Sequence, residues 1–342
     1  MTSVDSAAPA GIRRPAPTPL ERIQHTLHRH PVISPLVVLM VAAIACSIAN
    51  ERFLEPSNLS LVFQQVAIIG ALGVGQTIIV LTAGIDLSVG AIMIVVAMVM
   101  GKLAGHRGVP GPLAFIVGLA AGAAAGLLNG ALVARVKLPP FIVTLGMLNV
   151  FSAVALLMSG GKSIRGEELG SFLNWTSTSF AVGSVRLTVG VVLVLLMYAV
   201  VGFALSQTAW GRHVYAVGDD QAAARLAGIR TRRVLLSVYI VAGVVFALSA
   251  WVLIGRVGAA TPNAAVNANL DSITAVVIGG ASLFGGRGNL VGTLIGALIV
   301  GVFRNGLALA RVDILWQTLA IGVLIIVAVS LDQWIRRTGA TR

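Results

Sequence analysis

Charged side chains are scarce in this chain of 342 residues. Asp, Glu, Lys and Arg make up 11% of the sequence, whereas hydrophobic residues make up 57%. Soluble globular chains carry about 25% charged residues, so this composition leaves too little polar surface to cover a water-soluble fold of this size. The composition therefore predicts a membrane protein.

Cysteine is rare in the sequence, and its histidines do not form a cluster. The one cysteine, Cys46, lies in the first apolar run, which excludes an intramolecular disulfide. The five histidines fall in loops or in the N-terminal tail, without the spacing of a metal site. No set of side chains forms a catalytic constellation. We therefore expect neither a metal, nor a cofactor, nor a catalytic site.

A phosphate-binding loop of the pattern G-x-x-x-x-G-K-[ST] is missing as well. Gly161, Lys162 and Ser163 supply the end of that pattern, but Leu156 stands where its first glycine belongs. We therefore expect that the chain does not hydrolyse ATP itself.

Acidic residues that could carry protons through a membrane are few. Asp86 falls between two apolar runs, whereas Asp271, Asp313 and Asp332 lie near the ends of runs. Proton-coupled carriers usually contain buried carboxylates or histidines in relay. An ion-coupled secondary carrier is therefore the weaker transport hypothesis, and it stays open as the alternative.

Long apolar runs are what the sequence has instead. A spanning helix needs about 20 apolar residues, or fewer where it is broken or buried among other helices. The runs predict an all-α, polytopic membrane protein with about ten transmembrane helices. They cover 32–50, 61–83, 90–104, 112–134, 141–159, 187–206, 234–256, 270–284, 289–310 and 314–332. The runs at 90–104 and 270–284 are too short to cross alone unless they extend into their glycine-rich flanks.

Basic residues set the expected orientation. The formal net charge is +12, and Lys and Arg gather in short loops and at the termini, as on the cytoplasmic side of membrane proteins. This distribution argues against nucleic-acid binding. We predict cytoplasmic tails at 1–31 and 336–342, a transmembrane domain at 32–335, an external loop at 160–186 and a cytoplasmic loop at 207–233.

Two short matches suggest an internal repeat. Asn129-Gly130 is followed, after three residues, by Ala-Arg-Val at 134–136. Asn305-Gly306 is followed, after three residues, by Ala-Arg-Val at 310–312. The two copies lie an odd number of predicted spans apart, so they would be inverted, an arrangement common in transporters. The inverted repeat is a hypothesis at this stage.

The segment 81–90 interrupts two apolar runs. Gly84 and Gly90 permit a broken helix, and Asp86 is a residue type that caps backbone N–H groups. One interpretation is a short loop with an aspartate cap. The other is a re-entrant element beside a substrate path, because a charge inside the membrane is costly and tends to be retained for use.

A short helix is predicted within the basic loop 207–233. Asp219 and Asp220 are N-cap residue types, the alanine-rich stretch 221–227 favours a helix, and Gly228 is a typical C-terminal stop. Without further information, this helix could equally be a solvated part of the loop.

Several motifs in this order resemble the permeases of the ribose/xylose/arabinose branch of ATP-binding-cassette (ABC) sugar importers. They are LTAGIDLSVG at 81–90, PPFIVTLG at 139–146, GRHVYAVG at 211–218, SITAVVIGG at 272–280 and LFGGRG at 283–288. Within that family the chain looks closest to fructose-import permeases, through PTPLERIQH at 17–25 and DQWIR at 332–336. The resemblance covers residues 17 to 337.

The resemblance implies a permease subunit in the bacterial inner membrane, which carries a fructose-like or ribose-like monosaccharide and is not an enzyme. It implies a second permease copy, cytoplasmic ATP-binding subunits and a periplasmic sugar-binding protein as partners. It also implies that the loop 207–233 couples the permease to the ATPase. The residues expected to do so are Asp219, Asp220, Ala223, Ala224, Arg225 and Gly228. Ala222 departs from the family, which often has Glu there.

Polar residues inside the apolar runs are the candidates for a path that hydrogen-bonds sugar hydroxyls. They are Gln76, Thr82, Asp86, Asn129, Thr144 and Asn305. In membrane helices, such groups more often hydrogen-bond neighbouring helices than a substrate, so this alternative stays open. The sequence fixes neither the sugar nor the residues that touch it.

Overall fold

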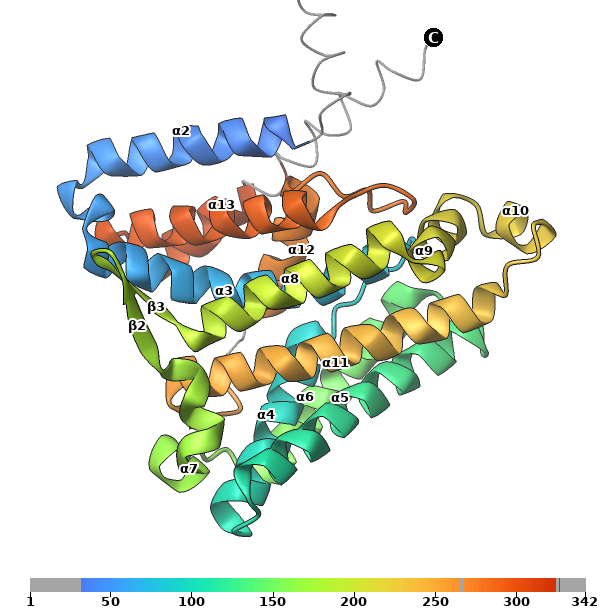
Figure 1. Ribbon diagram of the computed structural model, residues 1–342, viewed down its shortest axis with the longest axis horizontal. Coiled ribbons are helices and arrows are strands. Elements are labelled where there is room, and N and C mark those ends of the chain that lie inside the picture. Colours follow the sequence, from blue (N-terminus) through green and yellow to red (C-terminus); the bar gives the residue numbers. More distant parts are fainter. Residues whose placement is uncertain (1–31, 265–266, 324–325, 327–342) are drawn as a thin grey trace, which may run out of the picture.

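The computed structural model describes residues 32–264, 267–323 and 326. The predicted tails at 1–31 and 336–342 lie outside the described residues, as does most of 324–335. The described chain is almost entirely helical, with two small antiparallel sheets at one end (Figure 1). The all-α membrane fold predicted from the apolar runs is therefore confirmed.

Seven described helices are long and apolar enough to cross a membrane by length and composition. The first five are α3 (Pro56–Val80), α4 (Val89–Gly101) with the π-helical turn η2 (Lys102–His106), α5 (Gly111–Ala134), α6 (Pro140–Ser159) and α8 (Val189–Gln207). The other two are α11 (Thr231–Val257) and α13 (Leu290–Leu309).

Three shorter apolar helices match the remaining predicted runs: α2 (Ile33–Ala49), α12 (Ala268–Ile278) and Ile314–Val323. The α12 helix has 11 residues, which at 1.5 Å per residue reach only about half of a membrane. The exact number of ten spans therefore stays a prediction.

Short elements occupy the two ends of the helix bundle. The external loop predicted at 160–186 contains α7 (Gly166–Asn174), the turn η3 (Trp175–Ser177) and the hairpin of β2 (Ser179–Val182) and β3 (Val185–Thr188). A second small sheet pairs β1 (Ile164–Arg165) with β4 (Ala259–Ala260).

The opposite end carries α9 (Ala209–Asp219) and α10 (Gln221–Leu226) (Figure 1). The sequence predicted α10 but missed α9, which begins where the Thr208 side chain accepts a hydrogen bond from the Gly211 N–H. The loops 160–186 and 207–233 thus lie at opposite ends of the bundle, as the predicted topology requires.

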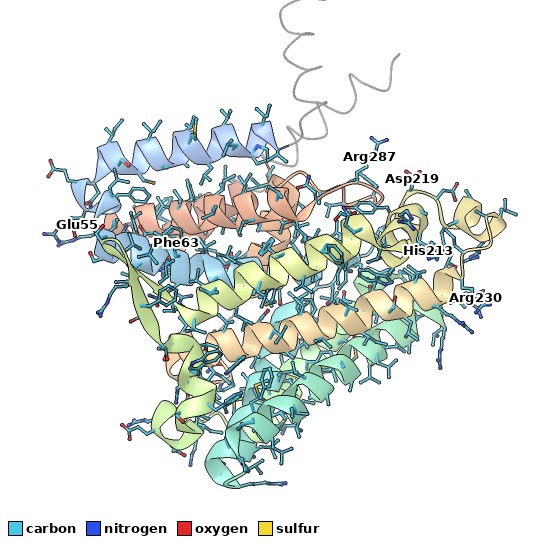
Figure 2. The ribbon with its side chains drawn as sticks, in the orientation of Figure 1. Glu55, Phe63, His213, Asp219, Arg230 and Arg287 are labelled. Atoms are coloured by element: carbon cyan, nitrogen blue, oxygen red, sulfur yellow. The ribbon has the colours of Figure 1, made fainter. Side chains whose placement is uncertain are left out.

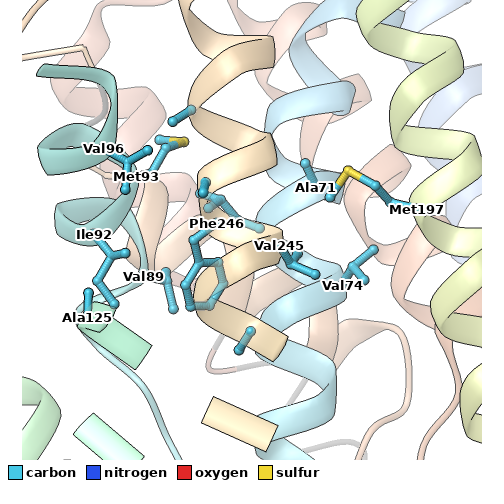
Figure 3. Close-up of a cluster of buried hydrophobic side chains, with 14 of the residues drawn as sticks. Ala71, Val74, Val89, Ile92, Met93, Val96, Ala125, Met197, Val245 and Phe246 are labelled. Atoms are coloured by element: carbon cyan, nitrogen blue, oxygen red, sulfur yellow. The ribbon is translucent and has the colours of Figure 1, made fainter. Parts of the chain in front are cut away.

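The core lies where α3, α4 and α11 meet. Phe246 of α11 is 1% exposed, and its ring lies beside Val89 and Ile92 of α4 (Figure 3) and against Gly75 of α3. Burial is greatest on α3 and α11, whereas α5, α6 and α8 expose many large apolar side chains. In a membrane these outer faces contact lipid.

Gly122, Gly126 and Gly130, which are spaced four positions apart in α5, let this helix approach α11 closely. A Cβ at Gly122 would collide with the carbonyl oxygen of Gly243, and one at Gly126 with the carbonyl oxygen of Tyr239. Both obstacles are backbone atoms, which move only if the two helices separate. These glycines therefore permit the close packing of α5 on α11.

We expect Gly126→Val to destabilise the protein by about 1–3 kcal/mol, the usual cost of overpacking a tight core. The measurement is the thermal unfolding midpoint of the detergent-purified protein. Gly146→Val in α6 is the matched control, because nothing lies within 4 Å of a Cβ at Gly146. Equal midpoints for the two variants would contradict the close approach of α5 and α11.

Candidate functional site

The first candidate site is the non-helical segment between α3 and α4. The chain leaves α3 through a turn in which Ala83 has a positive φ of 59° and the Gly84 N–H donates to the Ile79 carbonyl. It then runs without regular structure to Ser88. The two apolar runs are therefore separated by a non-helical segment, as both interpretations of the segment 81–90 require.

Asp86 orders this break. Its Oδ1 accepts hydrogen bonds from the Ser88 backbone N–H (2.7 Å) and the Ser88 hydroxyl (2.6 Å), and the residue is 1% exposed. Ser88, and not Asp86, occupies the N-cap position of α4. The aspartate therefore holds the turn that leads into the helix and does not cap the helix itself, because it lies two residues before the N-cap position.

Two neighbouring helices hold the break in place. Asn129 of α5 donates to the Ser88 hydroxyl oxygen at 2.8 Å and lies 3.4 Å from Oδ2 of Asp86. Thr144 of α6 donates to the Ile85 carbonyl at 3.0 Å or to carbonyls of its own helix. The structure thus brings together three of the predicted path residues, Asp86, Asn129 and Thr144, in one buried cluster.

Tyr239 completes the surroundings of the break. Its hydroxyl lies 3.2 Å from where a Cβ of Gly84 would be, and it has no hydrogen-bond partner among the described residues. Sequence reasoning missed both Ser88 and Tyr239. The spacing Asp-x-Ser before a helix was a signal for Ser88, whereas nothing local in the sequence points to Tyr239.

The other predicted path residues lie elsewhere. Asn305 exchanges hydrogen bonds of 2.9 Å with Asn58 near the start of α3, and Thr82 donates to Ile79 within its own turn. Gln76 is fully buried, and its amide has no partner among the described residues. The six residues therefore do not form one path. Most of those that make hydrogen bonds connect neighbouring helices or stabilise a turn.

The short helices α4 and α12 meet at their N-termini. The Gly90 N–H donates to Oδ1 of Asn269 at 2.6 Å. From this point α4 runs towards β1 and β4, because Gly101 lies against Ala260. The α12 helix runs the opposite way, towards the loop 279–289.

This arrangement supports the predicted inverted repeat. A long helix, a non-helical segment, a short helix and another long helix occur twice in this order, as α3–α4–α5 and as α11–α12–α13. Asn129 and Asn305 fall in the last two turns of α5 and α13. Such repeats place discontinuous helices at the middle of a membrane.

The second candidate site is the helix α10, at the far end of the bundle (Figure 1). Its N-cap is Asp220, whose Oδ1 accepts hydrogen bonds from the N–H groups of Ala222 (2.7 Å) and Ala223 (3.0 Å). Gly228 follows the helix with a φ of 84°, a conformation that favours glycine. Arg225 donates from Nε to the Thr231 hydroxyl at 3.0 Å.

The exposed face of α10 differs from the expected one. Ala223 is exposed, but Ala224 is 5% exposed and packs into the core. Ala224 therefore does not face a partner, because the helix turns it towards its own chain. Leu226, which sequence reasoning missed, is 92% exposed and is an apolar side chain facing outwards at the end of this helix.

The helix α9 connects the exposed helix α10 to the non-helical segment between α3 and α4. A Cβ at Gly218 would collide with the Leu81 carbonyl oxygen, and the same oxygen accepts a hydrogen bond of 3.0 Å from the Gly286 N–H. Asp219, labelled in Figure 2 near Arg287, packs its backbone against Gly286. Tyr215 donates to the Gly288 carbonyl at 2.9 Å. The end of α9, the loop 279–289 and the start of the break thus form one contact.

Comparison with known proteins agrees with these features. Residues 58–329 match the family described as "Branched-chain amino acid transport system / permease component". The chain is 49% identical to the fructose import permease protein FrcC of Rhizobium meliloti, over 94% of this chain and 91% of that protein.

Two further relatives are also named as sugar transport permeases. The ribose import permease protein RbsC of Bacillus subtilis (strain 168) is 40% identical, over 88% of this chain and 92% of the relative. The D-allose transport system permease protein AlsC of Escherichia coli (strain K12) is 35% identical, over 88% and 91%. No solved structure matches the chain. The chain therefore belongs to this family of membrane permease components, as a transport subunit and not as an enzyme.

Proposed function

We propose that this permease is the membrane-spanning subunit of an ATP-binding-cassette importer for a monosaccharide, with fructose as the first candidate. The observation that carries the proposal is the 49% identity to a fructose import permease over 94% of the chain. The relatives at lower identity carry ribose and D-allose in their names, so the shared substrate class is a neutral sugar. An ion-coupled secondary carrier finds no support among these relatives.

The proposed assembly contains two copies of the permease, cytoplasmic ATP-binding subunits and a periplasmic sugar-binding protein, in the bacterial inner membrane. The chain itself lacks a phosphate-binding loop, so the energy of ATP hydrolysis has to reach it through a protein contact. The exposed α10 helix supports this role, because it lies at the end of the bundle with Ala223 and Leu226 facing outwards.

Movement of α10 would be transmitted through α9 to the break between α3 and α4. The contacts of Gly218 and Gly286 with the Leu81 carbonyl are made by backbone atoms without an intervening side chain. Rigid contacts of this kind transmit small displacements, because a packed interior does not deform continuously. The ordered Asp86 turn would then shift with the start of α4.

The proposed function is tested by deleting the gene and measuring uptake of radiolabelled fructose, ribose and D-allose by the cells. We expect fructose uptake to fall to background and to return when the intact gene is supplied. Loss of only ribose or only D-allose uptake would support a sugar importer but would show that its substrate is that sugar and not fructose. Unchanged uptake of all three sugars would contradict the proposal.

The proposed orientation places both termini and the loop 207–233 in the cytoplasm. We expect reporter fusions after Arg233 and after Arg342 to be active as cytoplasmic reporters, and a fusion within 160–186 to be active as a periplasmic reporter. The reason is the excess of Lys and Arg on the predicted inner side. An opposite signal at any of the three positions would refute this topology.

A further inference from the structure

One charged side chain of the helix α13 is partly open to its surroundings. Arg304 is paired with Asp271 of α12 through a contact of 2.6 Å between Nη2 and Oδ1. The Arg304 side chain is 32% exposed, whereas that of Asp271 is 6% exposed. Arginine within a membrane helix faces the interior of a bundle or water, because facing lipid costs about 3 kcal/mol or more at the helix centre.

The Arg304–Asp271 pair lies before the C-terminal end of α13 at Leu309. The helices α12 and α13 are antiparallel neighbours, in which Gly296 lies against Ala275 and Gly292 against Gly279. Asp271 therefore lies beside residues of α13 that precede Arg304. Since the Arg304 guanidinium contacts Asp271, it points back towards these residues. The side chain thus points back along α13 and not towards its C-terminal end at Leu309, the direction that a snorkelling arginine would take.

Neighbouring side chains share the open surface. Asn267, the N-cap of α12, lies three positions before Leu270 and four positions before Asp271, the spacings at which residues of a helix are neighbours. Asn267 is exposed and Leu270 is 56% exposed. Asn269, by contrast, is turned towards α4 and holds the Gly90 N–H.

The chemistry of this surface suits a neutral polyhydroxylated molecule. Arginine carries five N–H donors, of which one donates to Asp271; the Arg304 side chain is 32% exposed, whereas its Nε is buried. The exposed Asn267 amide supplies both donors and an acceptor. Since the Arg304–Asp271 ion pair has no net charge, this surface can hydrogen-bond hydroxyl groups without attracting ions of either sign.

We propose that Asn267, Leu270 and Arg304 line the sugar path of this permease, and that the buried Asp271 holds the Arg304 guanidinium in place. The inference rests on the proposed function and names the residues that meet the substrate. It replaces most of the polar residues expected from the sequence, since Asp86, Asn129 and Asn305 are buried and bonded within the chain. The polar surface lies beside the meeting point of α4 and α12, where inverted repeats place a substrate site.

The test is the accessibility of a cysteine at position 270. In a Cys46→Ala background, Leu270→Cys is compared with Leu196→Cys of α8, since both leucines are 56% exposed. Membrane vesicles with the full transport complex are treated with a charged, membrane-impermeant thiol reagent. Because only the thiolate reacts and a thiol in hydrocarbon stays protonated, we expect position 270 to react at least ~10-fold faster than position 196.

A second arm adds fructose and the sugar-binding partner before the reagent. We expect them to slow labelling at position 270 and to leave position 196 unchanged. Equal slow labelling at both positions, or fast labelling that the sugar does not change, would overturn the inference. Sugar uptake by the same vesicles is measured separately, so a failure of the proposed function is distinguished from a failure of this site.

Discussion

Asp86→Leu is expected to abolish sugar uptake and to lower the yield of folded permease. The aspartate is 1% exposed and accepts hydrogen bonds from the Ser88 N–H and the Ser88 hydroxyl, with Asn129 nearby. Leucine accepts none of them. Each buried polar group left unpaired costs about 1–3 kcal/mol, and two such losses are comparable with the stability of a typical domain.

Asp86→Asn is the matched control, because an asparagine carbonyl still accepts a hydrogen bond from the Ser88 N–H. We expect this variant to keep most of its folded yield and a measurable part of its uptake. Yield is measured by size-exclusion chromatography of the solubilised protein, and uptake with labelled fructose. Normal transport by Asp86→Leu would show that the break is an ordinary loop.

The second large effect is expected at α10. Ala223→Trp places a large side chain on the exposed face of this helix, so it should block docking of the ATP-binding subunit while the membrane helices fold normally. We expect normal membrane insertion, reduced co-purification of the ATP-binding subunit and loss of sugar-stimulated ATP hydrolysis in the assembled complex.

Two further variants separate docking from folding. Ala224→Trp should lower the folded yield as well, because Ala224 is 5% exposed and packs into the core. Ala181→Trp in the exposed strand β2 makes the same change at the opposite end and should leave co-purification of the ATP-binding subunit unaltered. If Ala223→Trp keeps full coupled uptake, α10 is not the docking helix, and the loop 135–140 becomes the next candidate.

The sequence predicted the helices well because burial in lipid and burial in protein both need apolar residues. Hydropathy alone does not tell where an apolar run stops being helical, and the run at 270–284 illustrates this. The helix α12 ends at Ile278, and the following glycines form the loop that contacts Leu81 and Gly218. That contact comes from residues far away in the sequence.

The polar residues of the candidate path were predictable as buried, but their partners were not. Asp86 and Asn129 meet because α5 packs beside the break, whereas Asn305 meets Asn58 because α13 packs on α3. Both asparagines occupy matching places in the repeat, yet their surroundings differ. Likewise, Ala223 and Ala224 are the same residue type, and only the way in which α10 packs on its own chain decides which of them is exposed.

The central claim, that this permease imports a sugar with energy from a separate ATP-binding partner, is tested most directly by reconstitution. The purified chain and its ATP-binding subunit are placed in liposomes with the sugar-binding protein, and uptake of labelled fructose is measured. We predict uptake that requires ATP and the sugar-binding protein and that stops with vanadate. Uptake by the chain alone, driven by a sodium or proton gradient without ATP, would contradict the claim.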